Sequence, residues 1–190
     1  MTKHDEYYNY LMNRSFLGRV YRHYWLYPRI SSYLEGHALD VGCGIGDMLS
    51  HRANTSGVDV NPRNVDHCRS LGFDAYVMQP DILPFESAVF DSALLDNVLE
   101  HISTPEPLLC EIKRVLRPKG SLVVGVPGVC GWHSDSDHKV SYDESTLKQC
   151  LSDQGFTHIT TFYAPLWRSS WLSRKLRQYC IYGVFVSDRS

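Results

Sequence analysis

A glycine-rich turn is the first feature of this sequence whose residues could do chemistry. The stretch LDVGCGIGD, residues 39–47, places Gly42, Gly44 and Gly46 directly after a short apolar run. Glycines at such a turn permit a tight backbone and let it approach a ligand closely. Many nucleotide-binding proteins share this spacing, so the turn alone indicates a nucleotide-like ligand without identifying it.

Two acids beside the glycines narrow the choice of ligand. The dinucleotide fingerprint GxGxxG would place its third glycine at position 47, where this chain has Asp47. A carboxylate there would repel a pyrophosphate, and no GKS or GKT follows to complete a P-loop. Asp40, two positions before Gly42, suits a cationic ligand instead. S-adenosylmethionine carries an ammonium and a sulfonium and has no phosphate, so it is the predicted cofactor.

The ends of three later strands add candidate contacts to this cofactor. Asp59 lies 19 residues after the first acid, close to the spacing at which an acid binds ribose hydroxyls in this architecture. Asp81 is placed to reach the adenine amino group, with Ile82 against the ring. Asn97, at the end of the fourth strand, is expected under the methionine portion.

A long polar loop, residues 127–145, follows the fifth predicted strand, and loops of this length inside a compact domain are usually functional. Its polar candidates are His133, Asp135, Asp137, His138 and Tyr142. Three interpretations stay open: a histidine general base for a hydroxyl acceptor, a metal site of His and Asp, or a loop held by its own hydrogen bonds. His138 and His133 are the catalytic candidates, and no metal ligands are assigned. His101, after the fourth strand, is a further candidate base.

Alternating apolar strands and helical patterns must position these residues. Strand patterns cover 37–41, 56–60, 75–79, 90–96, 121–126, 158–163 and 182–187. Helical patterns cover 47–52, 62–71, 105–116 and 144–154. This alternation predicts an α/β fold with a doubly wound, mostly parallel sheet, in which ligands bind at the carboxyl ends of the strands.

Both ends of the chain are basic and aromatic. Residues 1–35 are expected to form a helical cap, lying either over the mouth of the sheet or along its edge, while residues 36–190 form the single α/β domain. The tail 165–180 is interpreted either as a core-packed helix with a basic face or as a helix that makes weak contact with a membrane surface. Two basic ends favour an anionic acceptor, such as a phosphorylated glycan or a lipid carrier.

The composition limits the classes of protein to which this chain can belong. The 190 residues are 43% hydrophobic and 21% charged with a formal net charge of -2, which is ordinary for a globular protein and argues against nucleic-acid binding. No apolar run approaches the length of about 18 residues that indicates a membrane span, and the polar start does not resemble a secretion signal. A cytoplasmic protein is therefore expected. The six cysteines include no CxxC pair and are expected to be free thiols.

Taken together, five motifs resemble those of the class I S-adenosylmethionine-dependent methyltransferases, in particular the small ubiquinone/menaquinone-methyltransferase-like, type 11 group. They are LDVGCGIG (39–46), GVDVN (57–61), DILPF (81–85), FDSALLDNVLEH (90–101) and LLCEIKRVLRPKGSLVVGVP (108–127). The resemblance implies a Rossmann-like seven-stranded sheet of order 3-2-1-4-5-7-6 with strand 7 antiparallel. The cofactor-binding residues that it implies are Asp40, Gly42, Gly44, Gly46, Asp59, Val60, Asp81, Ile82 and Asn97.

The activity that the resemblance implies is methyl transfer to a small-molecule, sugar or lipid-linked acceptor, with oxygen as the expected acceptor atom. Two other classes stay open. A nicotinamide-dependent oxidoreductase is disfavoured by Asp47 and by the absence of a YxxxK pair. A catalytically idle, methyltransferase-like binding module is disfavoured by the intact cofactor motifs. The (D/N)PPY signature of DNA amino-group methylation is missing.

Overall fold

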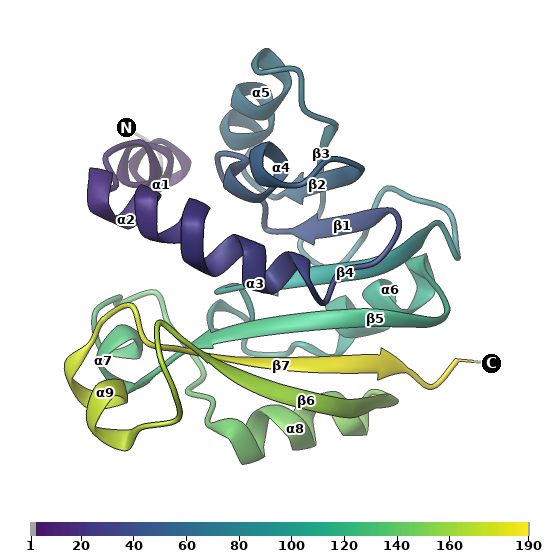
Figure 1. The fold of residues 1–190 in the computed structure, drawn as a ribbon. Coiled ribbons are helices and arrows are strands. Elements are labelled where there is room, and N and C mark those ends of the chain that lie inside the picture. The colour runs from purple at the N-terminus through teal and green to yellow at the C-terminus, as the bar shows by residue number, and fades with distance from the viewer. Residues whose placement is uncertain (1–2, 190) are drawn as a thin grey trace.

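A single seven-stranded sheet organises residues 3–189, the part of the chain that the computed structural model describes (Figure 1). The strands are β1 (Ala38–Val41), β2 (Thr55–Asp59), β3 (Ala75–Val77), β4 (Phe90–Asp96), β5 (Leu116–Pro127), β6 (Phe156–Ala164) and β7 (Cys180–Ser187). Their order is β3-β2-β1-β4-β5-β7-β6; the first five are parallel, and β7 is antiparallel to both β5 and β6. The predicted doubly wound fold is confirmed, including the antiparallel seventh strand.

Helices precede β1 and connect most of the strands. They are α1 (Lys3–Met12), α2 (Phe16–Tyr21), the π-helical turn η1 (Arg22–Leu26), α3 (Tyr27–Ser31), α4 (Asp47–His51), α5 (Pro62–Ser70), the 3₁₀ turn η2 (Leu99–His101), α6 (Glu106–Val115), α7 (Val129–Trp132), α8 (Glu144–Asp153) and α9 (Ser170–Lys175). Apolar positions in α6 and α8 pack on one face of the sheet, and those of η1 and α3 pack on the other. Both faces are therefore covered.

The core alternates between these two faces along each central strand. In β5, Leu122 and Val124 face the α6 and α8 side, whereas Val123 faces the η1 and α3 side. Successive side chains of a strand point to opposite faces of the sheet. When both faces are covered, the sequence of the strand is therefore a continuous apolar run. All six cysteines lie in the described part of the chain and are free thiols, as the sequence predicts.

The N-terminal helices and the segment before β7 meet at the edge of the sheet where the parallel strands finish. In Figure 1 the arrowhead of β1 points to the side on which α1, α2, α7 and α9 gather. Arg177 Nη2 donates a hydrogen bond to the Tyr10 hydroxyl at 2.8 Å, and Trp25 Nε1 donates to the Pro165 carbonyl at 2.8 Å. The N-terminal helices and the tail thus flank the same edge, at which doubly wound folds bind their ligands.

Element boundaries differ most from the sequence pattern at β5. This strand begins at Leu116, which pairs with Phe90, whereas the sequence places its start at residue 121. Pro118 and Gly120 lie within this strand, and the register with β4 shifts between Phe90 and Ser92. The polar loop after β5 also contains a short helix, α7, for which the sequence gives no periodic signal.

Most of the tail is not helical. Only Ser170–Lys175 forms α9, which buries Leu172 and leaves the side chains of Trp167 and Trp171 exposed. Within residues 3–189, no helix combines the length and the apolar character needed to cross a membrane.

Candidate active site

The glycine turn follows β1 directly and has the backbone geometry that the sequence predicts. Gly42 and Gly46 adopt φ values of 79° and 82°, which side-chain-bearing residues rarely occupy. A Cβ atom on Gly42 would lie 2.5 Å from Val98 Cγ2, so β4's carboxyl end packs against the turn without room for a side chain. The turn is therefore both conformationally and sterically restricted to glycine.

Asp59, at the end of β2, braces this turn. Its Oδ2 accepts a hydrogen bond from the Gly44 backbone N–H at 2.9 Å, and its Oδ1 accepts one from the Asn61 N–H at 2.8 Å. Burial raises the pKa of Asp59, although the hydrogen bonds from Asn61, Asn64 and Gly44 act in the opposite direction. Each carboxylate oxygen can accept a second hydrogen bond, so the brace and a contact with ribose hydroxyls are compatible.

Several carboxylates converge below the glycine turn. Asp40 is 5% exposed, and burial raises its pKa well above the ordinary range. The charges of Asp96, Asp59 and Asp47 raise it further. Two arginines offset part of this negative charge: Arg14 contacts Asp47 at 2.9 Å, and Arg22 lies 4.0 Å from Asp96. A cationic group bound here would be stabilised by the remaining charge.

The residues predicted to hold the adenine are more open. Val60 and Ile82 are 45% and 55% exposed, and Asp81 is also exposed. Ile82 N–H donates to the Gln79 carbonyl, which folds the segment after β3 back on itself. Exposed apolar side chains next to a buried acid at the β2 end provide a surface on which a purine ring can pack.

Asn97 is held in an uncommon conformation at the end of β4. Its φ is 58°, a left-handed value that asparagine tolerates better than most residues. Its N–H donates to the Gly125 carbonyl at 3.0 Å, and its Nδ2 donates to Asp96 Oδ1 at 2.8 Å. These contacts fix the point at which β4 leaves the sheet, beside the acids described above.

The structure separates the two catalytic histidine candidates. His133 is exposed and lies against the Trp132 ring, with 4.9 Å between the ring centroids. The His138 side chain is 8% exposed and lies 4.7 Å from the His101 ring, centroid to centroid. His138 Nδ1 is 2.7 Å from the Trp132 carbonyl oxygen. Because a carbonyl only accepts, Nδ1 carries the proton and Nε2 presents a lone pair when the ring is neutral.

Glu100 completes this group of side chains and is not among the residues found from the sequence. Its Oε1 lies 3.8 Å from His138 Nε2, and its side chain is fully buried. Burial raises the pKa of Glu100 to about 8; its own backbone N–H acts against this, and the charges of Asp96 and Asp135 act in the same direction as burial. The pair Glu100-His101, a few residues after the buried strand β4, is visible in the sequence, but the approach of His138 from the distant loop could not be predicted from it.

The other polar candidates of the loop serve its structure. Asp135 Oδ1 accepts a hydrogen bond from the Asp137 N–H at 2.9 Å. Tyr142 is 9% exposed and packs in the core that α6 and α8 cover. Burial and His138 lower the pKa of His101, whereas the charge of Asp135 and the Asp137 backbone raise it. The outer part of the loop thus contains at least one hydrogen bond of its own, between Asp135 and Asp137.

Helix α1 packs over the glycine turn. Leu11 is 1% exposed, and its Cδ1 lies 3.2 Å from where a Cβ of Gly44 would be. At the other end of α1, the His4 carbonyl accepts a hydrogen bond from Asn61 Nδ2 at 2.9 Å. Burial raises the pKa of Tyr7 to about 12, and the charges of Asp59 and Glu100 act in the same direction. Tyr7 thus lies near both Asp59 and Glu100.

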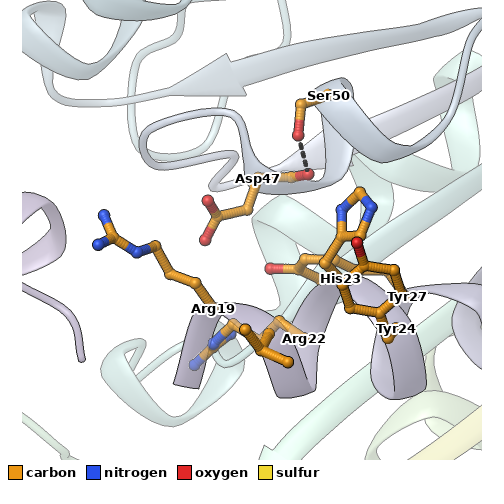
Figure 2. A pocket seen from close by; sticks show the side chains of 8 residues that line it. Arg19, Arg22, His23, Tyr24, Tyr27, Asp47 and Ser50 are labelled. Carbon is orange, nitrogen blue, oxygen red and sulfur yellow. Dashed lines mark hydrogen bonds between the residues drawn. The ribbon is translucent and has the colours of Figure 1, made fainter. Parts of the chain in front are cut away.

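A cavity of about 300 Å³ opens between the N-terminal helical segment and α4. Figure 2 shows Asp47 and Ser50 on α4 above the residues that line it from this segment. These are Arg19, Val20, Arg22, His23, Tyr24 and Tyr27. Because Asp47 directly follows Gly46, the cavity adjoins the glycine turn and combines basic groups with aromatic rings.

Comparison with known proteins shows that this chain is similar to methyltransferases. The family model described as a methyltransferase domain matches residues 39–124. A tRNA (carboxymethyluridine(34)-5-O)-methyltransferase from Xenopus tropicalis is 30% identical over 139 residues, covering 68% of this chain and 21% of that protein. A demethylmenaquinone methyltransferase from Tropheryma whipplei is 33% identical over 94 residues, covering 45% of this chain and 39% of that protein.

A solved structure shares the fold over nearly the whole chain. It is an S-adenosylmethionine-dependent methyltransferase from Thermotoga maritima, described as a possible histamine N-methyltransferase. It superposes with a TM-score of 0.74 at 17% sequence identity and covers 92% of each chain. At this identity the likeness is one of fold. The chain spans only 30% and 45% of the lengths of two further curated relatives that it matches, from Streptomyces fradiae and Methanocaldococcus jannaschii.

Proposed function

We propose that this chain transfers a methyl group from S-adenosylmethionine to a hydroxyl oxygen of a small acceptor. The chain belongs with the class I S-adenosylmethionine-dependent methyltransferases, since residues 39–124 match the model of a methyltransferase domain. The observation that carries the proposal is the acid cluster of Asp40, Asp59 and Asp96 beside a glycine-restricted turn. This site suits a cationic nucleoside and would repel a pyrophosphate.

Within this site each predicted residue has a separate role. The backbone of the glycine turn approaches the cofactor, and Asp40 stabilises its positive charge. Asp59 accepts the ribose hydroxyls through the lone pairs that its backbone contacts leave available. Asp81 accepts from the adenine amino group, and Val60 and Ile82 pack on the ring. Asn97 lies under the methionine portion.

On the acceptor side, we assign to His138 the task of assisting removal of the acceptor's proton. The sulfonium is already activated, so the protein mainly has to hold the two reactants in line. A hydroxyl acceptor must also lose its proton, for which a positioned group is needed. The Nε2 lone pair of His138 is oriented by the bond at Nδ1. His133, exposed on the outside of the loop, is the weaker candidate.

The names of the relatives span several acceptor classes. The Xenopus tropicalis protein is named for a uridine oxygen, the Tropheryma whipplei protein for demethylmenaquinone, and a Caenorhabditis elegans relative as a sterol 4-C-methyltransferase. Buried Glu100 and His138 favour oxygen for this chain, because methylation of a hydroxyl requires that its proton be taken up. Aromatic side chains around the cavity, including Tyr24 and Tyr27, would cover a flat acceptor.

Binding of the cofactor is tested by thermal unfolding with three ligands. S-adenosylmethionine and S-adenosylhomocysteine should each raise the unfolding temperature, because a ligand at about 100 times its Kd stabilises the native state by about 2.7 kcal/mol. NAD at the same concentration should leave the unfolding temperature unchanged. Stabilisation by NAD alone would instead indicate an oxidoreductase, and no response to any of the three would indicate an idle module.

An anionic acceptor is proposed from the remaining positive charge at the site. Arg14 and Arg22 are paired with Asp47 and Asp96, so these acids offset part of their positive charge. Arg19 is exposed and lines the cavity. Exposed charges are screened beyond about 8 Å at physiological ionic strength, so the kcat/KM for an anionic acceptor should fall as salt is added.

The salt dependence is measured on phosphorylated and unphosphorylated forms of one acceptor. The phosphorylated form should lose efficiency with salt, and Arg19→Ser should remove most of that loss. Equal efficiencies for the two forms at every salt concentration would exclude charge as a determinant of acceptor choice.

A further inference from the structure

Three potential metal ligands converge below the loop that follows β5. Glu100, His101 and His138 each offer one ligand atom, and these atoms all lie within 4.8 Å of one another. Glu100 and His101 come from η2, directly after β4, and His138 comes from the segment between α7 and α8. The Glu100 carbonyl oxygen accepts the N–H groups of Lys139 and Val140 at 2.8 and 3.1 Å, which holds the loop against η2.

The Glu100 carboxylate lacks the partners that a buried charge requires. Within residues 3–189, neither of its oxygens has a hydrogen-bond donor, although the side chain is fully buried. His138 Nε2 is 3.8 Å from Oε1 and presents a lone pair, because the Trp132 carbonyl holds the proton on Nδ1. With Glu100 ionised, two acceptors face one another across a gap, and either a proton or a metal ion between them would satisfy both.

We propose that Glu100, His101 and His138 bind a divalent transition-metal ion, for which Zn²⁺ is the reference species. Two imidazole nitrogens and one carboxylate oxygen are a common ligand set for such ions, and three protein ligands leave a coordination position open. Bonds of about 2.0–2.1 Å place ligand atoms about 3–3.5 Å apart. The 3.8 Å separation of His138 Nε2 and Glu100 Oε1 needs little contraction to reach this range.

The second nitrogen of His138 supports this assignment independently. Metal-bound histidines usually donate their other N–H to a carbonyl or carboxylate, which fixes the ring and its tautomer. The contact of 2.7 Å between His138 Nδ1 and the Trp132 carbonyl is of this kind. In this tautomer Nε2 carries the lone pair that a metal ion requires, and it faces the buried carboxylate of Glu100.

An ion at this position would also take part in the proposed methyl transfer, and this part of the inference rests on that proposed function. Val98, two residues before Glu100, lies over Gly42 of the cofactor turn. An acceptor hydroxyl bound at the open position would lose its proton to solvent more readily, as metal-bound water does. The oxygen then attacks the methyl carbon, the carbon–sulfur bond breaks, and its electron pair stays on sulfur. His138 thus assists proton removal as a ligand of the ion.

Metal binding is tested on the whole chain after dialysis against a chelator, with no cofactor present. Calorimetry and elemental analysis should find one Zn²⁺ per chain, and Co²⁺ should give a visible absorption band. Glu100→Gln and His138→Ala should each weaken Zn²⁺ binding by at least about tenfold, since loss of an outer partner alone costs about 10–100-fold. His133→Ala, in the same loop but exposed, is the matched control and should bind normally.

Glu100→Gln preserves the shape of the side chain and should fold, which circular dichroism checks; His101→Ala replaces it if it does not. The ion should raise the unfolding temperature of the unmodified chain by more than it raises that of either variant at the same concentration. Substoichiometric Zn²⁺, or equal affinities in the variants and the unmodified chain, would overturn the metal site. S-adenosylhomocysteine binding, measured on the same samples, reports on the proposed function separately from the ion.

Discussion

Turnover is expected to fall by about 10²–10⁴-fold when His138 is replaced by alanine, the range over which a positioned acid–base group usually contributes. The affinity for S-adenosylhomocysteine should stay within about twofold, because His138 lies with Glu100 and His101 rather than at the glycine turn. The measurement is kcat at saturating S-adenosylmethionine, using a hydroxyl acceptor selected by product release from the unmodified enzyme.

Loss of turnover in this variant could also come from a distorted loop, because the His138 ring contacts the Trp132 carbonyl. His138→Asn addresses this, since its amide N–H can donate near the position of Nδ1 while nothing replaces Nε2. The asparagine variant should be impaired as strongly as the alanine variant. His133→Ala should retain normal turnover. Full activity in His138→Asn would show that the histidine only supports the loop.

The sequence predicts the sheet and the cofactor turn because both depend on local pattern. Strands such as β4 and β5 are buried on both faces and appear as apolar runs, and the glycines of the turn are required by positive φ values within a few residues. Asp59 is predictable in the same way, since it ends β2 at a spacing that the parallel topology fixes. These features need no knowledge of contacts between distant segments.

Features that depend on distant contacts escape the sequence pattern. Glu100 is polar and lies in an apolar stretch, and only the packing of the loop around residues 138–140 against it produces its burial. The π-helical turn η1 widens one helical turn without a periodic signal. Leu11 reaches Gly44 because α1 folds back over the sheet, and nothing in the polar, aromatic sequence of α1 specifies that target.

The affinity for S-adenosylhomocysteine is expected to weaken by about 1–3 kcal/mol in Asp59→Ala, because the ribose hydroxyls lose a charged acceptor. Calorimetry measures the change directly. Asp81→Ala is the matched control at the same site: Asp81 is exposed, so its proposed contact with the adenine amino group would compete with water, and its removal should cost less. The predicted order of affinities is the unmodified chain, then Asp81→Ala, then Asp59→Ala.

Asp59 also braces Gly44 and Asn61, so its removal could weaken binding by loosening the turn. A double-mutant cycle separates the two effects by comparing S-adenosylhomocysteine with its 2′-deoxy analogue. If Asp59 contacts the ribose, the analogue should bind the unmodified chain more weakly than the parent ligand, and Asp59→Ala should no longer distinguish the two. If the brace alone matters, the ratio of the two affinities will be the same in both proteins. That result would remove Asp59 from the ligand contacts while leaving its role in the turn intact.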